Sequence, residues 1–336
     1  MRGGIVAAGN IVRDCSKLLE HFPEENGLVR CTQMHAAPGG GAANVSMSLA
    51  ALCPQMPVRP LCLLGQDSEG DALLQALSAY PNIDTGLVGR RGQTAFADVL
   101  TVQGSSVRSF VYYPGPNALM DIDDFRLDTL ECEILHMGYI LALDALDAPD
   151  AQFGTRMARL LHLLRHKGIR TSVDVVSEAS DRYKTKVPPC LAHADYVFMN
   201  EVEAGRTTGL ELRNAHGQID LQAVREALSR IRQMGAPGWI AIHMPEGAAG
   251  TDGEGNVEFV PGAVLQEGFI AATVGAGDAF AAGGLIAAQH GLSLRDALEC
   301  GVAAATACLQ SPGAAAQCTL EEALALLKGF PRSALG

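Results

Sequence analysis

Residues 150–174, DAQFGTRMARLLHLLRHKGIRTSVD, place an amphipathic helix pattern directly before a strand pattern. Apolar residues recur at helical spacing through residues 150–166, and residues 170–174 form a short run typical of a buried strand. The same order returns at residues 221–234 and 239–242, where a second helix pattern precedes the apolar run WIAI. Repetition of this order predicts parallel strands in one sheet, with helices packed on both faces.

The alternation extends over most of the chain. Residues 44–52 and 71–79 have helix patterns, and short apolar runs lie around them. These runs predict further buried strands at residues 4–8, 60–64, 134–137 and 196–199. The fold class that follows is α/β, with a doubly wound and mostly parallel sheet.

One region breaks this alternation. Residues 95–102 and 107–113 have strand patterns joined by Gly104-Ser105-Ser106, which is typical of a hairpin. Residues 11–37 also lack a helix pattern. We expect the two segments, approximately 11–37 and 91–115, to form a small sheet beside the main one, as a lid would. No linker marks a second domain, so residues 1–330 are expected to form a single domain.

The composition limits the classes of partner. The chain has 336 residues, with 25 Lys and Arg against 37 Asp and Glu, and its formal charge is −12. This balance argues against binding to DNA or to anionic membranes, because both depend on clusters of Lys and Arg. Two uncharged segments, residues 31–58 and 300–320, contain too many small and polar residues to span a bilayer. Nine cysteines without C-x-x-C spacing predict free thiols, and no signal-peptide pattern opens the chain, so we expect a cytoplasmic protein.

The segment ATVGAGDAF, residues 272–280, carries the most chemistry. Its small residues run into a predicted helix, so the amides of Gly275, Ala276 and Gly277 would lie at a helix N-terminus, where they can bind an anion. Asp278 lies beside them, and its carboxylate can take a proton from an attacking hydroxyl. The alternative for the same residues is that Asp278 only caps the helix.

Two further segments carry residue types that bind ligands. PGGGAAN, residues 38–44, offers close backbone approach at Gly40 and Gly41, and Asn44 supplies both a donor and an acceptor. A flexible turn before a helix would explain the same glycines. NEVE, which begins at Asn200, follows an apolar strand, and there Asn200 and Glu203 can hold metal-bound waters on a phosphate. An ordinary helix start would look the same.

Taken together, these segments resemble the signatures of the PfkB/ribokinase family of carbohydrate kinases, over residues 9–327. The first signature resembles the stretch that ends at Asn44, and the second resembles Gly275-Ala-Gly-Asp278. GNIVRD, which ends at Asp14, resembles the family's sugar-contacting loop. The remaining matches fall in the expected order: Gly65-Gln-Asp67, Gly70, Gln93-Thr94, Pro116-Asn117, Asn200-x-x-Glu203 and Gly313-Ala314.

The resemblance implies a three-layer α/β/α ribokinase-like fold with a small β-sheet lid. It implies that ATP and Mg²⁺ are used to phosphorylate a hydroxymethyl group on a small sugar or sugar derivative. By position it implies the following roles: Asp278 as general base, Gly275, Ala276 and Gly277 as anion hole, Asp14, Gly40, Gly41 and Asn44 as acceptor ligands, Asn200, Glu203 and Gly247 on the nucleotide, and Glu203 on Mg²⁺ through water.

Two alternatives remain open at this point. The same residues would serve a nucleoside kinase of the adenosine type, whose acceptor is a ribose hydroxyl, and a sugar- or nucleotide-binding regulator without catalysis could keep the fold. We also expect a homodimer formed through the lid. Many family members carry Asp where this chain has Ala272, a position associated with monovalent cations, so the resemblance predicts weak or no K⁺ dependence. Asp144, Asp147 and Asp150 predict a solvated acidic loop before a helix.

Overall fold

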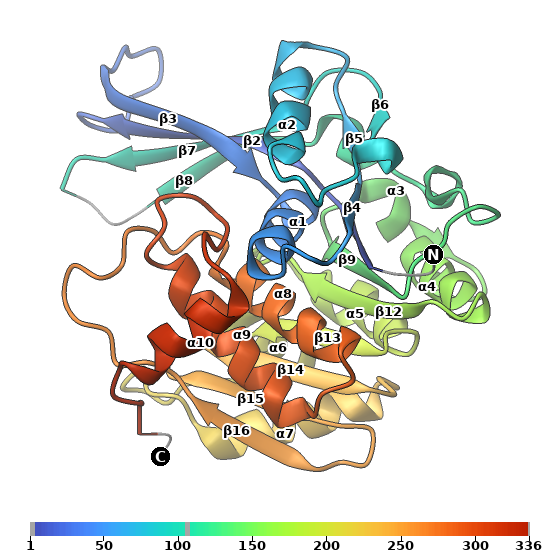
Figure 1. Cartoon of the computed structure of the whole chain (residues 1–336). Helices are drawn as coiled ribbons and strands as arrows, with labels where there is room; N and C mark the ends of the chain where they lie inside the picture. The colour runs from blue at the N-terminus through green and yellow to red at the C-terminus, as the bar shows by residue number, and fades with distance from the viewer. Residues whose placement is uncertain (1–3, 105–107, 335–336) are drawn as a thin grey trace.

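An eight-stranded sheet runs through the centre of the computed structural model, which describes residues 4–104 and 108–334 (Figure 1). Six neighbouring strands of this sheet pair in parallel, and the last two strands at one edge are antiparallel. In spatial order the strands are β16 (Val257–Pro261), β15 (Gly247–Thr251), β14 (Trp239–Met244), β13 (Tyr196–Asn200), β12 (Arg170–Val175), β9 (Ile134–Ile140), β1 (Ile5–Gly9) and β4 (Val58–Leu61).

Helices cover both faces of this sheet. A hydrophobic core lies on each face, and successive side chains of β1 point to opposite faces. Ile5 and Ala7 pack in one core, whereas Val6 and Ala8 pack in the other. One layer contains α1 (Gly41–Leu52), α2 (Ser68–Ser78), α8 (Ala276–Gln289), α9 (Leu294–Cys308) and α10 (Leu320–Lys328). The opposite layer contains α3 (Asp144–Asp147), α4 (Arg156–His166), α5 (Tyr183–Leu191), α6 (Glu201–Thr208) and α7 (Leu221–Gln233). The three-layer α/β/α prediction is therefore confirmed.

The helix at residues 221–234 agrees with its prediction to one residue, since α7 is Leu221–Gln233. The Asp220 carboxylate accepts from the amides of Gln222 and Ala223 at the first turn, and the buried positions follow helical spacing. The start predicted for the helix at 150 is wrong. The short strands β10 (Pro149–Asp150) and β11 (Gly154–Thr155) pair first, and Thr155 then caps α4.

The single strand predicted at residues 60–64 is divided in the structure. Its first part belongs to β4, at the edge of the main sheet, where Pro60 is tolerated because one side of an edge strand needs no amide donor. Its second part is β5 (Leu63–Leu64), which pairs with β6 (Gly89–Arg90) in a separate two-stranded sheet. The chain therefore leaves the main sheet before the predicted strand ends.

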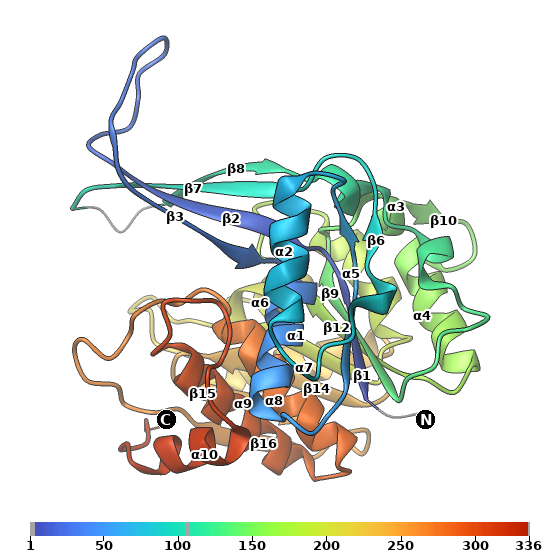
Figure 2. The ribbon, with the colours of Figure 1, turned by 45° about the horizontal axis from the view of Figure 1, so that its top comes forward.

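A second sheet of four strands extends beyond the helical layers (Figure 2). Its strands, in spatial order, are β3 (Cys31–Gly39), β2 (Val12–Leu19), β7 (Phe96–Val102) and β8 (Arg108–Tyr113). The pair β2–β7 is parallel, and the other pairs are antiparallel. The small sheet expected from residues 11–37 and 91–115 is therefore present. Residues 105–107, which include two residues of the expected turn and the expected start of the second strand, lie outside the described residues. Because β2 follows β1 and β3 leads into α1, this sheet is joined directly to the carboxyl end of β1 and to the N-terminus of α1.

Within the described ranges, no helix has the length and apolar character needed to cross a membrane. All nine cysteines are free thiols in the structure, and eight of them are buried or half-buried, whereas Cys31 is exposed.

Candidate active site

The N-terminus of α8 lies against the loop that contains Ala314. Gly275 is the N-cap residue, with a left-handed φ of 80°, and a Cβ at this position would lie 2.0 Å from the Ala314 carbonyl oxygen. Only glycine fits that close approach without a shift of the backbone. The loop and helix together leave the first amides of α8 without intrahelical partners, as at any helix start, and these are the amides of the predicted anion hole.

Asp278 is buried in the first turn of α8, and two side chains from distant elements donate to its carboxylate. Asn44 Nδ2, from α1, donates to Oδ2 over 2.9 Å. The Tyr139 hydroxyl, at the end of β9, lies 2.7 Å from Oδ1 and 2.9 Å from Oδ2. The Asn44 Oδ1 atom is buried and accepts no hydrogen bond from the described residues, so one acceptor of this side chain is unused.

Burial raises the pKa of Asp278 from 3.8 to about 6. The hydrogen bonds from Asn44 and Tyr139 lower this pKa in turn, and the negative charge of Asp14 raises it. The carboxylate is thus ionised at neutral pH and more basic than an exposed aspartate. These are the properties that a general base requires.

The residues predicted for the acceptor lie around β1 and the start of α1. A Cβ on Gly40 would lie 2.6 Å from the Asn10 carbonyl oxygen, and one on Gly41 would lie 2.7 Å from the Gly138 oxygen. These two glycines therefore let α1 begin close to the ends of β1 and β9. Asp14 lies further out, on β2 of the small sheet, and burial raises the pKa of its carboxyl to about 6.

Two more carboxyl groups are buried nearby: Asp174, near the end of β12, and Glu203, in the first turn of α6 directly after β13. Glu203 is in a capping box with Asn200, and its Oε1 also accepts from Ser177 over 2.6 Å. Burial raises the pKa of Glu203 to about 7, and burial followed by the charge of Glu203 raises the pKa of Asp174. A cation nearby would relieve this repulsion.

The fit to Mg²⁺ follows from this donor set. No group of three or more His, Cys, Asp or Glu side chains among residues 4–104 and 108–334 is arranged to hold a metal. Mg²⁺ commonly takes one or two carboxylates, with waters and substrate phosphates as its other ligands. Asp174 and Glu203 fit that pattern, since both oxygens of Glu203 already accept hydrogen bonds and would reach the ion through water.

Two adjoining clefts meet at the start of α8. The first, of about 360 Å³, contains the carboxyl groups of Asp174, Glu203 and Asp278. The second, of about 420 Å³, has apolar walls. The clefts share Asn200, His243 and Gly277, and so a ligand in the second cleft could reach Asp278 through the first.

The second cleft fits a nucleotide in size and chemistry. Its walls include Phe280 from α8, Val302 and Ala305 from α9, and Gly247 at the start of β15. Such apolar surfaces suit the faces of a purine base, whereas Asn200 faces the side toward the first cleft. Gly247 is therefore in the second cleft, apart from Asp278.

His243 separates the two clefts. A Cβ on Gly277 would lie 3.1 Å from His243 Cε1, and the imidazole packs on the Phe280 ring at a centroid distance of 5.0 Å. Burial lowers the pKa of His243 to about 4, so the ring is neutral at pH 7. It therefore adds no positive charge beside the predicted anion hole.

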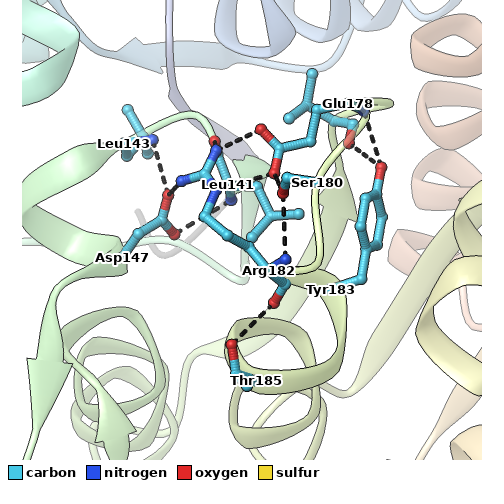
Figure 3. A network of polar contacts seen from close by, with 9 residues as sticks. Leu141, Leu143, Asp147, Glu178, Ser180, Arg182, Tyr183 and Thr185 are labelled. Atoms are coloured by element: carbon cyan, nitrogen blue, oxygen red, sulfur yellow. Dashed lines mark hydrogen bonds and ion pairs between the residues drawn. The ribbon is translucent and has the colours of Figure 1, made fainter.

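An ion-pair network joins the loops that follow β9 and β12 (Figure 3). Arg182 Nε donates to Glu178 over 2.9 Å, and its Nη2 donates to the Leu141 carbonyl over 2.9 Å. Asp147 accepts from the amides of Leu141 and Leu143, and it lies 4.0 Å from Arg182. The network joins the loop after β9 to the loop after β12, which follow Tyr139 and Asp174.

The sequence interpretation of the acidic run is wrong at Asp147. This side chain is 5% exposed instead of solvated, because two backbone amides and Arg182 satisfy its oxygens. Tyr139 is a site residue for which the sequence analysis makes no prediction. Its one sequence signal is position, since a polar side chain that follows an apolar strand pattern lies at the carboxyl edge of a parallel sheet.

Comparisons with known proteins agree with this architecture. The model of the pfkB family carbohydrate kinases matches residues 3–322. The chain is 26% identical to ATP-dependent 6-phosphofructokinase isozyme 2 of Escherichia coli (strain K12) over 295 residues, which are 87% of each chain.

Solved structures show the same fold. Arabidopsis thaliana ribokinase, complexed with ribose and ATP, superposes with a TM-score of 0.79 at 20% identity, over 98% of this chain and 100% of that one. Phosphofructokinase-2 from Escherichia coli, in complex with potassium, gives a TM-score of 0.73 at 22% identity, over 98% and 100% of the two chains. The fold is therefore ribokinase-like.

Proposed function

The chain belongs to the pfkB family of carbohydrate kinases, which are phosphotransferases with an alcohol group as acceptor, and on this premise we propose that it phosphorylates a hydroxymethyl group of a small sugar or sugar derivative. The observation that carries this proposal is the position of Asp278. Its buried carboxylate lies in the first turn of α8, beside the glycine-rich N-terminus and close to where an acidic cleft and an apolar one adjoin. A base, an anion-binding helix end and room for a nucleotide are thus adjacent.

In this proposal Asp278 takes the proton of the acceptor hydroxyl as its oxygen attacks phosphorus. ATP supplies the phosphoryl group, and Mg²⁺ neutralises part of its charge. The amides of Gly275, Ala276 and Gly277 face the negative charge that develops on the transferred group. The bond between the transferred phosphorus and the oxygen of the leaving ADP breaks, and Asp278 later gives its proton to solvent.

The acceptor would lie between the core and the small sheet. Asn44 Oδ1 is free to accept from one sugar hydroxyl, and Asp14 can accept from another. Gly40 and Gly41 would present backbone to the sugar. Closure of the small sheet as a lid would exclude water from the site, which protects the phosphoryl group from hydrolysis.

The nucleotide would occupy the second cleft. Its base would lie between α9 and the β14–β15 turn, near Gly247, and its phosphates would point toward Asn200 and the start of α8. Glu203 would hold Mg²⁺ through water. In this arrangement the ion and the reacting groups lie in the acidic first cleft, and the purine base of the nucleotide lies in the apolar second cleft.

The test is release of ADP from ATP and Mg²⁺ across sugars, sugar acids and nucleosides. We expect turnover with a sugar, and a fall in kcat of about 10²–10⁴ in Asp278→Asn, as is typical for loss of a general base. The substitution Asp71→Asn serves as a control, because the Asp71 carboxylate is exposed and lies on α2, away from both clefts. Turnover with nucleosides alone would indicate the nucleoside kinase, and ligand binding without turnover would indicate a regulator.

We also propose that the small sheet forms a homodimer. Apolar side chains are exposed on one face of its edge strand β8, where Phe110 is 65% and Tyr112 is 48% exposed, and alternation along the strand places both on the same side. A second copy would cover these side chains. Sedimentation of Phe110→Asp should show monomers where the wild type sediments as a dimer, while Leu292→Asp, exposed beside α9, should leave the dimer intact.

A further inference from the structure

Tyr139 is the feature of the site to which neither the sequence pattern nor the family resemblance gave a role. Its hydroxyl lies within hydrogen-bond distance of both Asp278 oxygens, at 2.7 and 2.9 Å. A phenol has a single proton, so this hydrogen bond is shared between the two acceptors. The Tyr139 hydroxyl therefore contacts both carboxylate oxygens of the proposed general base.

The two Asp278 oxygens are not equivalent. Oδ2 accepts from Asn44 Nδ2 and from Tyr139, whereas Oδ1 accepts from Tyr139 alone among the described residues. A carboxylate oxygen has two lone-pair positions. Both positions on Oδ2 are thus used, and one position on Oδ1 stays available for a further donor.

We propose that Tyr139 is a positioning residue that holds the Asp278 carboxylate so that Oδ1 takes the proton of the acceptor hydroxyl. This inference rests on the proposed function, because it concerns how the base is aimed. The acceptor O–H bond breaks, the new Asp278 Oδ1–H bond forms, and the oxygen that remains attacks phosphorus. Tyr139 keeps its own proton throughout this step.

The surroundings of Tyr139 support a fixed orientation. Its neighbours Gly138 and Ile140 pair with Gly9 of β1 and Val175 of β12, so its backbone lies in the middle of the main sheet. The loop that follows is held through the Leu141 carbonyl by Arg182. A side chain on such a support can hold a partner to within a fraction of an ångström.

The phenol is also suited to remain a donor. Desolvation, and then the negative charge of Asp278, raise the pKa of Tyr139 well above its usual value of 10. It stays protonated over the whole range in which the enzyme can be assayed. The other titratable groups that line this cleft are Asp174 on β12, Glu203 on α6 and His243 on β14, and the charge of Asp14 on β2 also acts on Asp278.

The test is Tyr139→Phe, which keeps the ring and removes the hydroxyl. Loss of a hydrogen bond to a charged group should raise the pKa of Asp278, and with it the acidic limb of the kcat/KM profile, by about one to two pH units. Above this limb, kcat should fall roughly tenfold because the base is less well aimed, while KM for the acceptor changes little. A purely structural role for Tyr139 would leave the position of the acidic limb unchanged.

A second readout does not need activity. With ¹³C-labelled aspartate carboxyl groups, the resonance of Asp278 can be assigned by its loss in Asp278→Asn, and its pKa can be titrated by NMR in wild type and in Tyr139→Phe. The matched control is Tyr196→Phe, which removes a hydroxyl bonded to Arg170 at the start of β13. We expect the control to keep the wild-type pKa and profile.

The outcomes separate this inference from the proposed function. An unchanged Asp278 pKa, or an unmoved acidic limb in an active Tyr139→Phe enzyme, would overturn the role of Tyr139 and leave the proposed function standing if Asp278→Asn is inactive. Full activity of Asp278→Asn would overturn the proposed base itself. An upward shift of both readouts in Tyr139→Phe alone supports the inference.

Discussion

Replacement of Asp278 by Asn should stabilise the folded protein at neutral pH while it removes activity. The carboxylate is buried, and burial raises its pKa from 3.8 to about 6. A group that is harder to ionise in the folded state opposes folding wherever it is ionised. Asn has nearly the same shape and no charge, and Asn44 can turn its free Oδ1 toward the new amide.

The size of the effect follows from the pKa difference of about two pH units. Each unit corresponds to about 1.4 kcal/mol, so ionised Asp278 should destabilise the fold by about 3 kcal/mol. Below pH 3.8 the group is protonated in both states, and the penalty is absent. Between pH 3.8 and 6 the folded state binds more protons than the unfolded state, so the penalty grows as the pH rises. Above about pH 7 the penalty is complete.

The assay is urea unfolding, followed by circular dichroism at pH 5, 6, 7 and 8. The free energy of unfolding of Asp278→Asn should exceed that of wild type by up to about 3 kcal/mol at pH 8, and the excess should shrink at pH 5. The control is Asp150→Asn, because backbone amides lower the pKa of the half-buried Asp150, and this substitution should therefore destabilise the protein. A lower stability of Asp278→Asn at pH 8, or a difference independent of pH, would refute the reasoning.

Four further outcomes are expected. Gly275→Ala places a Cβ 2.0 Å from the Ala314 oxygen at a left-handed φ, so urea unfolding should show a loss of about 2 kcal/mol or more. Glu203→Gln removes a charge at the proposed Mg²⁺ position, so the Mg²⁺ concentration for half-maximal ADP release should rise roughly tenfold. Arg182→Met frees the loops behind the first cleft, and steady-state kinetics should show a kcat/KM for the acceptor lower by roughly tenfold. Because Ala272 supplies no carboxylate, replacing K⁺ with a non-binding cation should leave the rate of ADP release unchanged.

Controls make these outcomes specific. Gly209→Ala has a similar φ of 73° but open space around the new Cβ, so it should be the milder of the two glycine changes. Arg230→Met removes an exposed ion pair on α7 and should leave the kinetics of the acceptor unchanged. A normal Mg²⁺ requirement in Glu203→Gln would contradict the role of Glu203, and strong activation by K⁺ would contradict the expectation for Ala272.

The elements predicted well are those whose pattern is local. The helix α7 could be delimited to one residue because Asp220 caps it and its apolar residues keep helical spacing. The predicted start of α4 is too early because the polar residues before Thr155 allow both a helical turn and the β10–β11 pair. The strand at residues 60–64 was not divided because its second half finds its partner at Gly89–Arg90, which lies far along the chain.

By itself the sequence determined the α/β alternation, the small sheet and the glycine-rich segments around Asn44 and Asp278, because periodicity, turn residues and motif order are local properties. The tertiary structure alone decided which polar groups meet. Asn44 and Asp278 are 234 residues apart, and Tyr139 and Asp278 are 139 apart, yet all three side chains meet at one edge of the sheet. Contact, burial and the resulting pKa depend on how the layers pack, and no local pattern contains that information.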